Sequence, residues 1–226
     1  MNRRWLVGEA FTVLALAALC PRQASALTLN FGAVEPEQTQ IVELSDGLEN
    51  AFAATVGYGR LVRGAGWLSL VGADLTMVMV DAADYRLRVG ASAPIIRGGP
   101  WMITARLFPL VRGSQNQLGR MTNLGVEAGL GGGFFGRHWF GAVDLGVDWA
   151  AATYVANSDR YRTTVYADAK DGWYASTGTR LLYGLFGGYS WRSVDLVLRA
   201  GQARDLNLGV WYIPFYATAG INLRWR

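Results

Sequence analysis

Apolar and polar residues alternate with a period of two along most of the chain after Phe52. In the segment 85–95 the odd positions carry tyrosine, leucine, valine, alanine, alanine and isoleucine, whereas positions 86 and 88 carry arginine. The segments that begin at Trp101 and Trp139 repeat this arrangement. Because successive side chains of a β-strand point to opposite faces, the alternation predicts strands with one apolar and one polar face. We count nine such segments, separated by glycines or polar turns, so the chain is predicted to be all-β.

The length of these segments separates a membrane protein from a soluble one. They run to about twelve residues, whereas strands of soluble proteins average about five or six and a tilted strand needs about 9 to 11 to cross a bilayer. Tryptophans near the segment ends fit an aromatic belt at the lipid interface: Trp67, Trp101, Trp139, Trp149, Trp191 and Trp225. Because hydrocarbon leaves backbone N–H and C=O groups without water, a spanning sheet has to close on itself. We therefore predict a closed antiparallel transmembrane β-barrel.

The N-terminus has the pattern of a secretory signal. Arg3 and Arg4 precede an apolar run of about fifteen residues, and Ala24-Ser25-Ala26 offers a small-x-small cleavage site. The run is shorter than the roughly 20 residues of a spanning helix, which argues against a helical anchor. Lipidation at Cys20 is the alternative, but Leu19 before it is bulky for such a site. We predict a cleaved signal over residues 1–26 and one barrel domain over 27–226.

The C-terminal strand carries the most specific motif of the chain. Thr218, Gly220, Leu223 and Trp225 follow a polar-x-Gly-x-x-apolar-x-aromatic spacing. This spacing resembles the C-terminal β-signal of bacterial outer-membrane proteins, although Arg226 follows the final aromatic residue here. The resemblance implies recognition by the outer-membrane assembly machinery, a location in the outer membrane and contact with its lipid and lipopolysaccharide.

The turns predict an orientation and a strand number. Short turns are expected at 64–66, 97–100, 136–137 and 190–193, and longer loops at 80–84, 113–121, 155–173 and 203–207. Barrels of this kind keep short turns in the periplasm and long loops outside. With a periplasmic C-terminus, an even strand number needs a tenth strand, for which Leu27–Phe31 is the candidate, with 35–50 as the first outer loop. Eight strands with a periplasmic N-terminal segment are the alternative.

Charged residues recur on the polar faces of the predicted strands. They comprise Arg86, Arg88, Arg106, Arg112, Arg180, Arg199 and Arg224, opposed by Asp74, Glu127, Asp144, Asp148 and Asp195. Unpaired charges in a narrow lumen are costly, so we expect a network of arginine–carboxylate pairs inside a largely filled barrel of about ten strands. A charge-lined pore is the alternative. A catalytic use of the carboxylates is a third.

Little in the sequence indicates catalysis or a bound cofactor. His138 is the single histidine and falls at a predicted periplasmic turn, away from the outer side where the sites of outer-membrane enzymes generally lie. With no cysteine after the predicted signal, neither a metal site nor a disulfide scaffold is expected. The glycine-rich stretch 129–136 lacks the lysine and helix of a phosphate loop and fits a bend, or room for a bulky lumen neighbour.

The expected function follows from these features. We predict a monomeric, non-enzymatic outer-membrane barrel with an envelope structural or surface-interaction role, and a narrow passive channel is the alternative. The loop 155–173 mixes aromatic residues with both charge signs, which suits a recognition surface outside the cell. No nucleic-acid partner is expected, because three arginines and one glutamate of the signal account for half of the formal net charge of +4.

Overall fold

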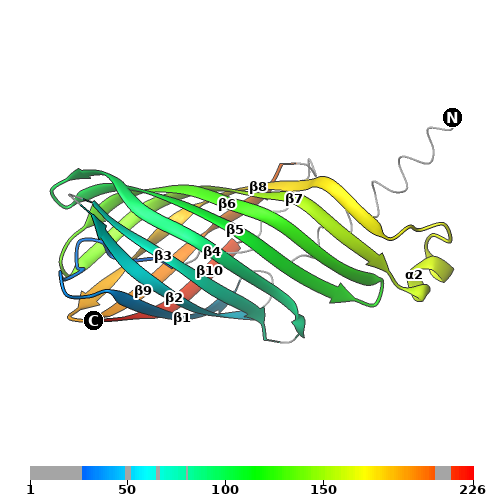
Figure 1. Cartoon of the computed structure of the whole chain (residues 1–226), viewed down its shortest axis with the longest axis horizontal. Helices are drawn as coiled ribbons and strands as arrows, with labels where there is room; N and C mark the ends of the chain where they lie inside the picture. The colour runs from blue at the N-terminus through cyan, green and yellow to red at the C-terminus, as the bar shows by residue number, and fades with distance from the viewer. Residues whose placement is uncertain (1–26, 49–51, 65–66, 80, 207–214) are drawn as a thin grey trace.

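Ten antiparallel strands close into one barrel in the computed structural model, which describes residues 27–48, 52–64, 67–79, 81–206 and 215–226 (Figure 1). Each strand pairs with its neighbours in the chain, and β1 pairs with β10 to close the sheet. The strands are β1 Gln40–Leu48, β2 Phe52–Gly64, β3 Trp67–Val78, β4 Asp81–Gly98, β5 Trp101–Asn116, β6 Gly119–Phe135, β7 Trp139–Asn157, β8 Gly172–Trp191, β9 Val194–Asp205 and β10 Phe215–Trp225. A short helix, α2 (Asp159–Thr164), lies between β7 and β8. The predicted all-β closed barrel of ten strands is confirmed.

The first strand is not the one that the sequence predicted. The structure places β1 at Gln40–Leu48, within the expected outer loop 35–50, and leaves Leu27–Phe31 outside the sheet. Both predictions were wrong because the outward face of β1 is interrupted by Asp46, which obscures the alternation. The regular alternation of Leu27–Phe31 instead serves a segment buried inside the barrel.

The connections sort to two rims, as Figure 1 shows. The C-terminal rim carries Arg226 and the short turns at 99–100, 136–138 and 192–193. The loop rim carries α2 and the β5–β6 hairpin turn at residues 117–118. The bounds of three expected long loops were wrong, because strand pairing continues into them: β4 begins at Asp81, the β5–β6 hairpin turns over residues 117–118, and β9 runs to Asp205. Positions 80 and 207 of these expected loops lie outside the described residues.

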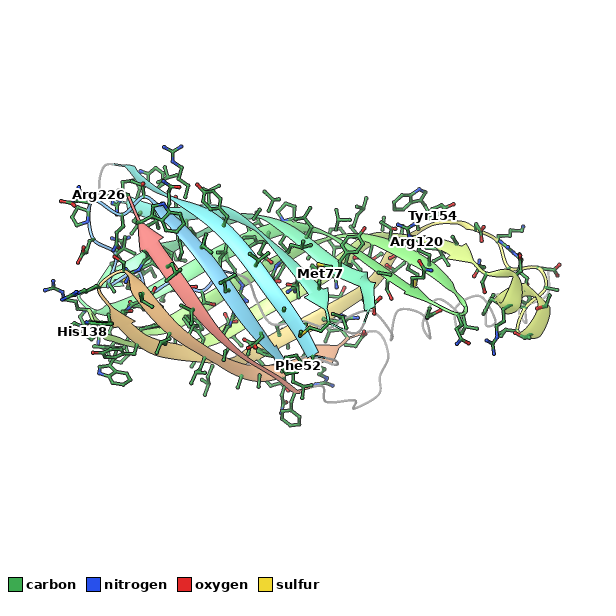
Figure 2. The ribbon with its side chains drawn as sticks, turned by 90° about the horizontal axis from the view of Figure 1, so that it is seen from below. Phe52, Met77, Arg120, His138, Tyr154 and Arg226 are labelled. Atoms are coloured by element: carbon green, nitrogen blue, oxygen red, sulfur yellow. The ribbon has the colours of Figure 1, made fainter. Side chains whose placement is uncertain are left out.

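The barrel wall has unequal height. Strands β4 to β8 have 16 to 20 residues, whereas β1, β2, β3, β9 and β10 have 9 to 13. At about 3.3 Å per residue and a tilt of about 40°, a strand of about 11 residues rises roughly 28 Å and one of about 20 rises roughly 50 Å. The apolar band of a bacterial outer-membrane barrel is about 25 Å tall. The long hairpins therefore extend past the short strands at the loop rim, where Figure 2 labels Arg120 and Tyr154.

The outward face of the barrel is apolar on its strands. Leucines 185 and 198 are 63% and 66% exposed, and apolar side chains face outward on each of the ten strands. Five tryptophans form a ring at the C-terminal rim: Trp67, Trp101, Trp139, Trp191 and Trp225. Trp149 faces outward within β7. Soluble monomers rarely expose a continuous apolar surface of this extent.

Candidate functional site

Six charged side chains form a continuous series of ion pairs across the barrel interior. Arg88 contacts Asp74 Oδ1 through Nη2 (2.9 Å) and Glu127 Oε2 through Nη1 (2.8 Å). Arg106 contacts Glu127 Oε1 through Nε (3.2 Å) and Asp144 Oδ2 through Nη2 (3.1 Å). Arg199 Nη2 completes the series at Asp144 Oδ2 (2.9 Å). These residues come from β3, β4, β6, β5, β7 and β9, so one series joins six strands. Acidic and basic groups alternate along it, and each guanidinium is held by at least one carboxylate.

The series is desolvated as well as paired. Glu127 and Arg88 are each 1% exposed, and Glu127 bridges the guanidinium groups of Arg88 and Arg106. Room for Arg106 comes from Gly129, where a Cβ would lie 2.5 Å from the guanidinium carbon. Buried ion pairs contribute little net stability, but removing one partner leaves a costly uncompensated charge. Loss of any one member of the series would therefore leave a buried charge without its counter-ion.

A second charged group lies toward the loop rim. Arg112 pairs with Asp148, and Arg180 lies 3.8 Å from Asp205. Together with Thr153 these residues line a cavity of about 40 Å³, enough for a few water molecules. Arg86, which was expected in the network, donates to Thr76 Oγ1 (3.1 Å) on the neighbouring strand. All eight residues expected to form the lumen charge network thus face the interior. Four of them belong to the ion-pair series, three to this second group, and Arg86 bonds to Thr76.

The segment before β1 fills the lumen toward the C-terminal rim. Leu27, Leu29 and Phe31 are less than 9% exposed, although they belong to no strand. They pack into an apolar cluster supplied by inward side chains of the barrel: Ile41, Leu61, Leu68, Leu70, Met102, Phe108, Phe135, Phe140, Ala142, Phe186 and Val197. We call residues 27–38 the plug. The sequence reasoning missed it, because alternation alone does not tell a strand that faces lipid from a segment buried in a lumen.

Hydrogen bonds hold the plug to the C-terminal rim. Asn30 Nδ2 donates to the carbonyl of Gly136 (2.9 Å) and to Ser190 Oγ (2.8 Å). Arg224 Nη1 donates to the carbonyl of Ala33 (2.6 Å), and Arg63 Nη1 to that of Gln38 (2.7 Å). Arg63 and Arg224 donate from the barrel wall to the plug, and Asn30 donates from the plug to the wall. The plug is therefore fixed on several sides. It closes the interior near this rim with both apolar and polar contacts.

Residues 155–173 and the β5–β6 hairpin turn at 117–118 form an ordered structure at the loop rim, which we call the projection. Ser158 caps α2 by accepting from the amide of Tyr161 (3.1 Å), and its hydroxyl donates to the carbonyl of Gln117 (2.8 Å) in the neighbouring hairpin. Asp171 accepts from the amide of Asn157 (2.8 Å) and from Arg162 (2.8 Å). These contacts, the Asn157 amide first, lower the pKa of the Asp171 carboxyl. The expected loop 155–173 is shorter than predicted, because β7 and β8 extend to Asn157 and from Gly172.

The remaining candidate residues take distinct places. Of the β-signal residues, Thr218 and Gly220 face inward, whereas Leu223 and Trp225 face outward at the end of β10. His138 lies in the turn at the C-terminal rim (Figure 2), with Nδ1 3.2 Å from the carbonyl of Ser190. Among the described residues, no group of three or more His, Cys, Asp and Glu side chains could hold a metal ion. No helix within the described ranges is long and apolar enough to cross a membrane.

No family model and no curated protein matches the chain. Among solved structures, the barrel is similar to the beta domain of the Bordetella autotransporter Brka, with a TM-score of 0.39 and 14% sequence identity. The match covers 83% of this chain and 99% of that domain.

Proposed function

We propose that the protein is an outer-membrane barrel whose filled interior makes it a rigid support for the projection at the loop rim. The observation that carries this proposal is the filled lumen: the plug fills it toward the C-terminal rim, and the ion-pair series crosses the barrel interior. A barrel that conducted solutes would need a continuous aqueous path. Two interior cavities, toward the loop rim and beside the plug, have volumes of only about 40 and 30 Å³.

The outer surface supports a location in a membrane. The apolar outward face, the ring of five tryptophans and the rise of roughly 28 Å of the short strands match a bilayer core of about 30 Å. The short turns and the β-signal lie at the rim with the C-terminus, which fits insertion from the periplasm by the outer-membrane assembly machinery. Outer-membrane lipid and lipopolysaccharide are then the partners of the wall, and the barrel acts as a monomer.

The projection is the part suited to surface interaction. It exposes Trp173 (59%) and Val165 (58%) beside charged residues of both signs, while its backbone is held by the contacts of Ser158 and Asp171. A pre-ordered loop loses less conformational entropy on binding than a mobile one. We propose no catalytic activity, because the single histidine lies at the opposite rim, stacked against Tyr189.

Epitope tags test the orientation. An antibody should reach a tag inserted at Asp168 on intact cells, whereas a matched tag at Arg137 should be reached only after the outer membrane is permeabilised. The reverse pattern would overturn the proposed orientation. Planar-bilayer recordings of the purified protein should show no steady conductance, and a stable ion current would favour the channel alternative.

A further inference from the structure

Four inward positions form one row across β10, β1, β2 and β3. The register pairs Asn222 with Glu43, Glu43 with Gly57, and Gly57 with Asp74. The gap above Gly57 is occupied by Leu27, the first described residue. A Cβ on Gly57 would lie 3.0 Å from Leu27 Cδ2 and 3.4 Å from the Cβ atoms of both Glu43 and Asp74. The row therefore lies against the start of the plug.

Three acceptors in this row have no donor. Within the part of the chain that the structure describes, Glu43 Oε2, Asp74 Oδ2 and Asn222 Oδ1 are buried and accept no hydrogen bond. The other polar atoms of these side chains are occupied. Ser45 donates to Glu43 Oε1 (3.2 Å), and Arg88 donates to Asp74 Oδ1 (2.9 Å).

The third side chain ties the row to the plug. Asn222 Nδ2 donates to the carbonyl of Thr28 (2.6 Å), the residue after Leu27. Two of the three open acceptors belong to carboxylates, and no ion pair to Glu43 is formed among the described residues. A buried carboxylate oxygen without a donor is costly, so the row is complementary to a cation that carries several N–H groups.

We propose that the α-ammonium group of Leu27, released by signal cleavage after Ala26, is that cation. Hydrolysis of the Ala26–Leu27 peptide bond by a signal peptidase consumes one water. Ala26 leaves with the carboxylate, and the Leu27 nitrogen becomes an amine that takes up a proton at neutral pH. An ammonium group has three N–H donors, which matches the three open acceptors in number and charge.

The backbone at Leu27 is strained while the bond to Ala26 is intact. Leu27 has a φ of 31°, in the left-handed region that a residue with a Cβ rarely adopts. Once the bond to Ala26 is broken, rotation about N–Cα no longer moves a preceding peptide, and this constraint disappears. Processing would thus relieve local strain and supply the counter-charge of Glu43 in one step, so that the plug is fully held only in the mature chain.

The chain offers a direct test, because the mature protein would have only two primary amines, that of Leu27 and that of Lys170. Lys170 is exposed in the projection. The purified mature barrel is treated with an amine-acetylating reagent at neutral pH and analysed by peptide mass spectrometry. An α-amine ordinarily reacts faster than a lysine at this pH, because its pKa is lower. We expect the reverse in the native barrel, with Leu27 labelled at least tenfold more slowly than Lys170, and rapid labelling of both after unfolding.

Variants separate ion pairing from simple burial. The double substitution Glu43→Gln with Asp74→Asn should raise the native labelling rate of Leu27 severalfold, whereas the matched control Glu37→Gln, at an exposed carboxylate, should not. A mature chain that begins at another residue would overturn the proposal. So would native labelling of Leu27 as fast as that of Lys170, which needs no variant to be observed. An unchanged Leu27 rate in a folded double variant would overturn the pairing.

Discussion

Removing the carboxylate of Glu127 is the most direct test of how the interior is held. This side chain is 1% exposed and accepts from Arg88 Nη1 (2.8 Å) and Arg106 Nε (3.2 Å). Glu127→Ala leaves two buried guanidinium groups with one carboxylate less. Breaking a buried pair by removing one partner costs about 3–5 kcal/mol. Arg88 keeps Asp74 and Arg106 keeps Asp144, so we expect a loss near the lower bound, about 3 kcal/mol, in the free energy of unfolding.

Reversible denaturant unfolding in detergent micelles, followed by tryptophan fluorescence, measures this loss. The matched control is Glu37→Ala, because Glu37 forms an exposed pair with Arg226 and exposed pairs contribute about 0–1 kcal/mol. A thermodynamic cycle of Glu127→Gln and Arg106→Gln should show a smaller loss in the double variant than the sum of the two single losses. If Glu127→Ala cost less than about 1 kcal/mol and the parent conducted ions, the series would be solvated and the reasoning refuted.

Three further predictions concern the plug and the projection. A Cβ at Gly32 would lie 1.9 Å from the carbonyl oxygen of Phe135, so Gly32→Ala should loosen the plug. In micelles, residues 27–38 should then become sensitive to protease, whereas the parent resists. Equal resistance of the two proteins would contradict the packing. Leu29→Ala removes a 2% exposed side chain from the apolar cluster. It should lower the free energy of unfolding by about 2–5 kcal/mol in the same denaturant titration. A loss below about 1 kcal/mol would show that Leu29 is not packed. The pKa of the Asp171 carboxyl is lowered in the folded protein. The stability that this carboxylate contributes is therefore complete above its ordinary pKa of 3.8, and it is lost as the pH falls through the lower pKa of the folded state. Hydrogen-exchange protection of the Asn157 amide, corrected for the intrinsic rate, should therefore fall on acidification in the parent and stay constant in Asp171→Asn.

The strands of the barrel wall can be predicted from the local sequence. Alternation with a period of two states which side chains share a face, and the length of the alternating segments states that they are long strands. Both properties depend only on the geometry of an extended chain, so β4, β5 and β7 could be recognised without any tertiary information. The same logic identified the inward charges, because arginines and carboxylates recur opposite the apolar positions of the same strands.

The contents of the lumen were decided only by the tertiary structure. Leu27–Phe31 alternates like a strand, yet its apolar face meets Phe135 and Phe186 rather than lipid, because both environments accept the same side chains. Glu43 looked like part of a loop, since Asp46 and Gly47 interrupt the pattern around it. Which carboxylate meets which arginine also depends on closure: Arg199 and Asp144 are 55 positions apart and lie on strands that are not adjacent. Local periodicity fixes the direction of a side chain, whereas its partner across the lumen is set by how the sheet curves and closes.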